Sequence, residues 1–102
     1  FIPISITGLP QLGNSRILTA DIDADHDLDV LIYGTDIDGF IRIGFYFNNG
    51  NFSFSDAGIT LPRLYRGDAA LADFNMDNAP DLLLTGEDAA GIKHTLLYKN
   101  NK

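Results

Sequence analysis

Two short acidic stretches decide the fold of this chain. The first, DIDADHDLD at residues 21–29, recurs as DFNMDNAPD at residues 73–81, which lies 52 residues later. Each stretch places Asp or Asn at positions 1, 3 and 5 and Asp at position 9, and each lies between apolar segments. The spacing indicates two copies of one metal-binding loop that joins a pair of strands.

The 52-residue register extends well beyond the loops and needs no gap. A period near 50 residues is typical of propellers, solenoids and repeat arrays. The sequence therefore predicts a duplicated unit. Its identical pairs outside the loops are Leu9-Pro10 with Leu61-Pro62, Leu12 with Leu64, Ala20 with Ala72, Leu31 with Leu83, Gly34 with Gly86, Asp36 with Asp88, Gly39 with Gly91, Tyr46 with Tyr98, and Asn48-Asn49 with Asn100-Asn101.

Each unit is patterned as short strands. Apolar and polar residues alternate or form short apolar runs, and the Asn49-Gly50 pair is a hairpin signal. No segment has a sustained helical period, and ten Gly and four Pro interrupt the chain. We expect an all-β fold built from two four-stranded antiparallel propeller blades. The expected strands are 17–22, 30–33, 41–47 and 52–55 in the first unit, and 69–74, 82–85 and 92–98 in the second.

The units divide the chain unevenly. Residues 1–8 align with the end of the first unit's fourth strand, residues 9–60 form blade 1, and residues 61–102 form blade 2 without its fourth strand. Known propellers have about four to eight blades, so two blades cannot close a ring. Either further blades of a longer parent chain complete it, or copies assemble head to tail as a trimer or tetramer in which residues 1–8 close the last blade.

Hard cations suit the two loops. Ca²⁺ takes about six to eight oxygen ligands from a flexible loop, whereas Mg²⁺ prefers octahedral geometry with several waters. Eight of the fourteen acids fall in the two loops, and their repulsion would be relieved by about one Ca²⁺ per repeat. The alternative is an Asp-rich turn without metal. An EF-hand is excluded because its twelfth-position Glu would fall at Ile32 and Leu84.

Composition excludes several partners. The chain has 102 residues, a net charge of −7 and no cysteine, so we expect no nucleic-acid partner, no membrane insertion and no thiolate chemistry. Two Ca²⁺ would bring the formal charge of −7 to −3.

The loops, together with FYFNNGNF at residues 45–52 and their copy over 72–101, resemble FG-GAP/VCBS repeats, the calcium-binding blades of integrin-α-like β-propellers. The chain departs from that pattern at His26 and Asn78, where the family usually has Gly, and lacks a clear Phe-Gly or Gly-Ala-Pro signature. The resemblance implies an extracellular or cell-surface protein. It also implies calcium ligation by the side chains of Asp21, Asp23, Asp25, Asp29, Asp73, Asn75, Asp77 and Asp81, and by the carbonyls of Asp27 and Ala79.

These features favour a binding or adhesion module with structural calcium and no enzymatic activity. One alternative is a carbohydrate-binding, lectin-like or enzyme-associated propeller fragment, for which the four tyrosines would offer a sugar platform. Another is an isolated or engineered repeat unit that assembles into a homo-oligomer. Turn chemistry is the better explanation of Arg66-Gly67-Asp68, the tripeptide that some integrins recognise. The two histidines have no Ser or Cys nucleophile at a recognisable spacing.

Overall fold

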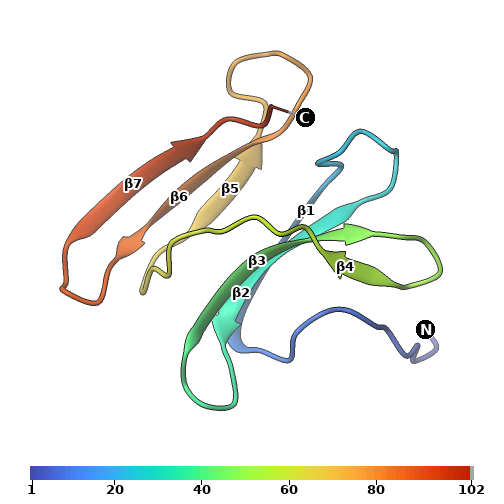
Figure 1. The fold of residues 1–102 in the computed structure, drawn as a ribbon, viewed down its shortest axis with the longest axis horizontal. Helices are drawn as coiled ribbons and strands as arrows, with labels where there is room; N and C mark the ends of the chain where they lie inside the picture. Colours follow the sequence, from blue (N-terminus) through green and yellow to red (C-terminus); the bar gives the residue numbers. More distant parts are fainter. Residues whose placement is uncertain (102) are drawn as a thin grey trace.

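The computed structural model describes residues 1–101, and these residues form two antiparallel sheets with no helix (Figure 1). The first sheet has the order β1-β2-β3-β4 and the second the order β5-β6-β7. The predicted all-β class and the division into four and three strands are therefore confirmed. The strands are β1 (Gly13–Ala20), β2 (Asp29–Thr35), β3 (Ile41–Asn48), β4 (Phe54–Asp56), β5 (Ala69–Ala72), β6 (Asp81–Glu87) and β7 (Lys93–Tyr98).

The two sheets share one strand register. In the first sheet Leu31 of β2 pairs with Leu18 of β1 and with Phe45 of β3. Its equivalent 52 residues later, Leu83 of β6, pairs with Ala70 of β5 and Leu97 of β7. The sequence repeat is thus also a repeat of strand pairing.

The hydrophobic core lies between the sheets. Leu31 is 0% exposed and Phe45 6%, and both pack with residues of the second sheet and of the segment 57–68 that links β4 to β5. Burying an aliphatic or aromatic side chain contributes about 1.5–3 kcal/mol, so this interface stabilises both sheets. The other buried members of the core are Leu61, Leu82 and Leu84.

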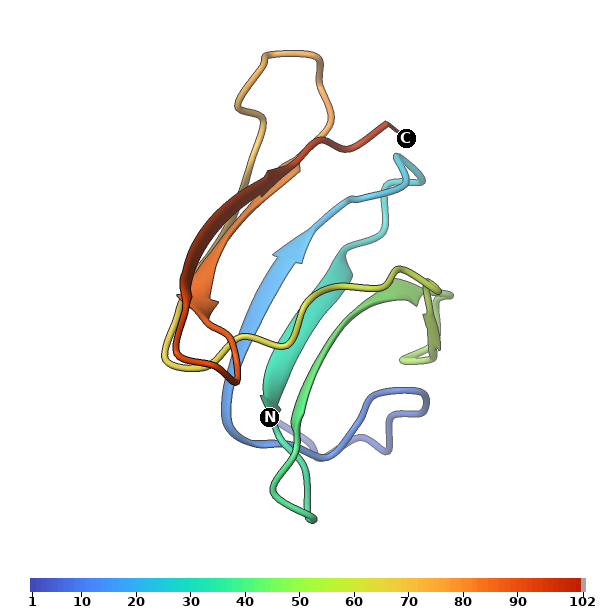
Figure 2. The same cartoon turned by 60° about the vertical axis from the view of Figure 1, so that its left-hand side comes forward.

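The sheets lie face to face with their first strands closest together, since β1 contacts β5. The turned view shows the second sheet beside the first, with residues 57–68 crossing from one to the other (Figure 2). The two acidic loops lie at one end of the sheets, and the β2–β3 and β6–β7 turns lie at the other.

Residues 1–6 form no strand here. The next residue, Thr7, forms an isolated parallel β-bridge with Ser53. Its N–H donates to Phe52 O at 3.3 Å, and its carbonyl accepts from Phe54 N–H at 2.9 Å. The expectation that residues 1–8 complete a blade stays a prediction.

No helix long and apolar enough to cross a membrane occurs in the part of the chain that the structure describes.

Candidate metal centre

The first acidic loop connects β1 to β2 and is organised by its own carboxylates. Asp21 accepts hydrogen bonds from the backbone N–H groups of Asp25 (3.1 Å) and His26 (2.9 Å). Asp25 Oδ1 accepts one from the N–H of Asp27 at 2.9 Å. The loop therefore wraps around its first and fifth side chains and directs further carboxylate oxygens inward.

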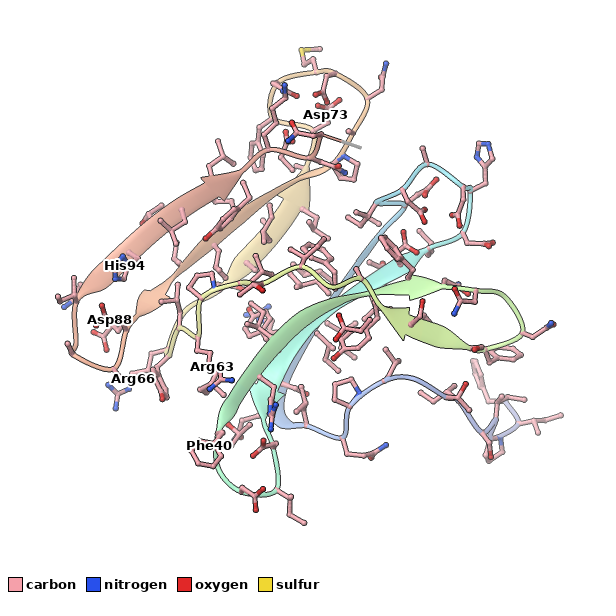
Figure 3. The ribbon with its side chains drawn as sticks, in the orientation of Figure 1. Phe40, Arg63, Arg66, Asp73, Asp88 and His94 are labelled. Atoms are coloured by element: carbon pink, nitrogen blue, oxygen red, sulfur yellow. The ribbon has the colours of Figure 1, made fainter. Side chains whose placement is uncertain are left out.

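The second loop, between β5 and β6, repeats these bonds at equivalent positions (Figure 3 labels Asp73). Asp73 accepts from the N–H groups of Asp77 (3.0 Å) and Asn78 (2.7 Å), and Asp77 accepts from the N–H of Ala79 at 3.0 Å. Two segments whose only identical residues are the aspartates at positions 1, 5 and 9 thus form the same hydrogen bonds.

Both loops use left-handed backbone at positions 4 and 6. At position 6, His26 and Asn78 have φ values of 72° and 70°. Glycine is the usual residue at such positive φ, but His and Asn adopt it more readily than most other residues. Ala24 and Met76 have φ values of 64° and 60°. Ala and Met are not typical left-handed residues, so sequence offered no signal for position 4, and each costs about 1–2 kcal/mol there.

Four carboxylates meet in the first loop. The side chains of Asp21, Asp23, Asp25 and Asp29 each offer an oxygen within 4.8 Å of the others. These are positions 1, 3, 5 and 9, the four predicted to ligate through side chains. Asp27, predicted to ligate through its carbonyl, has an exposed side chain that is not in this group.

The pKa values of the loop reflect this crowding. Partial desolvation raises the pKa of Asp23, as do its side-chain hydrogen bond with Asp25 and the charges of Asp29 and Asp25. Desolvation acts to raise the pKa of Asp21 too, but donation by the N–H groups of His26, Asp25 and Ala24 outweighs it, and that pKa is lowered. A cation among these oxygens would remove the repulsion that disfavours ionised Asp23.

The second loop gathers its acids less closely. Across residues 1–101, only the first loop gathers three or more acidic, His or Cys side chains whose ligand atoms all lie within 4.8 Å of one another. Asn75 stands at position 3, where the first loop has the carboxylate of Asp23, and donates Nδ2–H to Asp77 Oδ2 at 3.1 Å. Its amide would have to turn over to present Oδ1 to a cation. Ala79, at position 7, is only 1% exposed.

The ninth-position aspartates are buried anchors. Asp29, 1% exposed, accepts from the N–H of Ile22 at 2.8 Å and of Asn48 at 2.9 Å. Asp81, 3% exposed, accepts from the equivalent N–H groups of Phe74 (3.1 Å) and Asn100 (2.9 Å). Each joins the start of its loop to the end of the third strand of its sheet.

Sequence reasoning missed the two asparagines that complete this arrangement. Asn48 Nδ2 donates to Leu28 O at 3.0 Å inside its own sheet, whereas Asn100 Nδ2 donates to Ile22 O in the other repeat at 2.9 Å. Both belong to the repeated Asn-Asn pair, and that repetition was the signal available.

The β2–β3 and β6–β7 turns, at the other end of the sheets, are each stabilised by an aspartate that bonds within the turn. Asp36 accepts from the N–H groups of Asp38 and Phe40 and pairs with Arg42 Nε at 2.7 Å. In the second sheet Asp88 repeats this arrangement and contacts His94 Nε2 at 2.9 Å; Figure 3 shows the two side chains together beside the β6–β7 turn. His94 is thus a partner of a turn carboxylate.

Arg66-Gly67-Asp68 is held at the interface between the two sheets. Asp68 Oδ1 lies 3.3 Å from Arg16 Nε and accepts from Tyr33 Oη at 3.3 Å. A Cβ on Gly67 would lie 1.8 Å from Thr85 O, so close backbone approach explains the glycine. Tyr33, Tyr46, Tyr65 and Tyr98 line four different surface depressions and form no common platform.

Comparison with family models, with curated proteins and with solved structures found no match for this chain. The resemblance to FG-GAP/VCBS repeats therefore stays a prediction that rests on the residues themselves.

Proposed function

We propose that this chain is a calcium-stabilised β-propeller repeat module that acts outside the cell as a non-enzymatic binding or adhesion unit. The observation that carries the proposal is the convergence of Asp21, Asp23, Asp25 and Asp29 within 4.8 Å. Carboxylate oxygens in a loop that is otherwise closed by backbone hydrogen bonds are ligands that Ca²⁺ prefers.

A structural role for the cation follows from what the carboxylates already hold. Asp29 ties the loop to the end of β3 through Asn48 N–H, and Asp21 closes the turn. A cation among these side chains would cross-link β1, β2 and β3 at one end of the sheet. Extracellular modules bind Ca²⁺ with dissociation constants of about 10⁻⁴ to 10⁻³ M, a range that millimolar calcium fills.

The two loops should differ in affinity. Affinity rises with the number of charged ligands, and the first loop has four convergent carboxylates where the second has Asn75 in place of one. We expect the first loop to fill first in a calcium titration followed by isothermal titration calorimetry.

Thermal unfolding tests the proposal. At tenfold excess of calcium over Kd each site adds about 1.4 kcal/mol, which raises Tm by about 5–10 °C for a domain of this size. The gain in millimolar CaCl₂ over EGTA should vanish in the double variant Asp25→Ala, Asp77→Ala.

Asp38→Ala is the matched control, because it removes one exposed carboxylate at the opposite end of the first sheet. This variant should keep the full calcium-dependent rise in Tm. An unchanged melt of the parent chain with EGTA would refute the calcium proposal.

A further inference from the structure

The buried interface between the two sheets is asymmetric. The first sheet contributes the cross-strand row Leu18, Leu31 and Phe45. The second sheet contributes side chains from the other set of alternating positions, namely Ala69, Leu71, Leu82 and Leu84. Two different faces of the same repeat unit therefore meet in the core.

The outward face of the second sheet repeats the inward face of the first. Successive side chains of a strand point to opposite faces, so Leu83 lies on the face away from Leu82 and Leu84. It shares a row with Ala70 and Leu97, the equivalents of Leu18 and Phe45. Phe45 is 6% exposed, but Leu97 is 61% exposed.

The outward face of the first sheet repeats the inward face of the second. Ile17 pairs with Ile32, and these residues are the equivalents of Ala69 and Leu84 in the core. Ile17 is 59% exposed, whereas Ile32, on the central strand β2, is 7% exposed. The residues of each outward face are thus equivalent, by the 52-residue repeat, to residues of the other sheet that lie in the interface between the two sheets.

The charges near the first strands are also complementary. Arg16 and Asp68 occupy equivalent positions in the two repeats and pair at 3.3 Å, although 57% of each side chain remains exposed. If a second copy were placed as the next repeat, its Arg16 would occupy the position that follows Asp68 of the first copy. Asp68 would then lie between two arginines, and the charges would alternate around the assembly.

An open strand edge accompanies the apolar face. In the first sheet Ala57 N–H donates to Phe45 O at 2.9 Å beside β4. By the 52-residue repeat, the equivalent donor for Leu97 O of β7 would be Ser5 N–H of a second copy placed as the next repeat. Ile2 and Ile4, which are 82% and 52% exposed, would then lie along β7. Pro3 has no N–H, so this pairing lacks one bond of the ladder.

We propose that the outward face of the second sheet binds the outward face of the first sheet of another copy, which continues the internal interface from chain to chain. A heterologous interface of this kind closes into a ring when its rotation allows. Rings of about six or eight blades correspond to about three or four copies. This proposal rests on the sheet faces, the Arg16–Asp68 pair and the open edge of β7, and it does not need a bound metal.

Sedimentation velocity and light scattering of the 102-residue chain test it, in CaCl₂ and in EGTA. We expect one discrete species of about three or four times the 11.2 kDa chain mass. Leu97→Glu and Ile17→Glu should each reduce it to a monomer. Ile92→Glu, at a 58% exposed residue of the β6–β7 turn, is the matched control and should assemble like the parent chain.

Mixing the two disrupted variants tests the polarity of the interface. The Leu97→Glu chain keeps an intact outward face on its first sheet, and the Ile17→Glu chain keeps one on its second. Together they should form a 1:1 heterodimer that grows no further, with circular dichroism showing that each variant is folded.

Three outcomes would overturn the proposal. The first is a parent chain that stays monomeric at high concentration. The second is growth into open fibres, which would show that the contact between copies does not continue the internal interface into a closed ring. The third is a pair of folded monomeric variants that fail to form the heterodimer.

Discussion

Truncation of the buried anchor Asp29 should destabilise the chain even without any metal. Asp29→Ala removes the acceptor of two backbone N–H groups, those of Ile22 at 2.8 Å and Asn48 at 2.9 Å. Because the carboxylate is only 1% exposed, little water can replace it at once. Each N–H left without a partner costs about 1–3 kcal/mol.

For the pair the range is about 2–6 kcal/mol, and the expected loss lies in its lower half, because both hydrogen bonds are only partly buried and some water can reach the N–H groups. A loss of about 3 kcal/mol corresponds to a fall in Tm of about 12 °C or more for a domain of this size. Urea unfolding in EGTA, followed by circular dichroism, measures it without any contribution from calcium.

The matched control is again Asp38→Ala, which also removes one negative charge but from an exposed carboxylate. Its midpoint should stay close to that of the parent chain. If Asp29→Ala in EGTA melted within about 2 °C of the parent, a loss below about 0.5 kcal/mol, the assignment of Asp29 as a structural anchor would be wrong.

Two further substitutions probe features away from the metal loops. The hydrogen bond from His94 lowers the pKa of Asp88 below its ordinary value of 3.8, so its contribution to stability is present above pH 3.8 and is lost as pH falls through the folded-state pKa. Asp88→Asn should therefore lower the denaturation midpoint at neutral pH and have a progressively smaller effect below pH 3.8. Gly67→Ala would place a Cβ 1.8 Å from Thr85 O and force β5 away from β6; overpacking of this kind costs about 1–3 kcal/mol.

Each of these predictions has a result that contradicts it. A difference between Asp88→Asn and the parent chain that grows as the pH falls would show that the carboxylate is not stabilised by its turn. Gly13→Ala, whose added Cβ meets no atom within 4 Å, serves as the control for Gly67→Ala. Equal melting temperatures for these two variants would mean that the backbone at Gly67 does not approach Thr85 as closely as the structure indicates.

Much of the architecture was predictable because it depends on local periodicity. The alternation of β3 and the Asn-Gly pair after it gave both a strand and a hairpin, and both occur. The start of β1 was predicted too late. Gly13-Asn14-Ser15 has low strand propensity, yet Gly13 pairs with Thr35 across a register shift. Pairing with a neighbouring strand overrides the local preference there.

The candidate site was predictable only in its side chains. Asp spacing identified the four carboxylates that meet in the first loop. The conformation of Ala24 was not predictable, because nothing in an alanine indicates positive φ. The contact of Arg16 with Asp68 was not predictable either, because it depends on how the two sheets pack.

The hydrogen bond from Asn100 Nδ2 to Ile22 O joins the second repeat directly to the metal-binding loop proposed for the first. Residues that are 78 positions apart in the chain share one polar contact, and Asn100 also holds the buried Asp81 through its backbone N–H. A change in the position of Ile22, at the start of the first loop, would therefore alter the surroundings of the Asn100 side-chain amide. In a nuclear magnetic resonance titration, the side-chain amide of Asn100 would act as a reporter in the second repeat of events in the first.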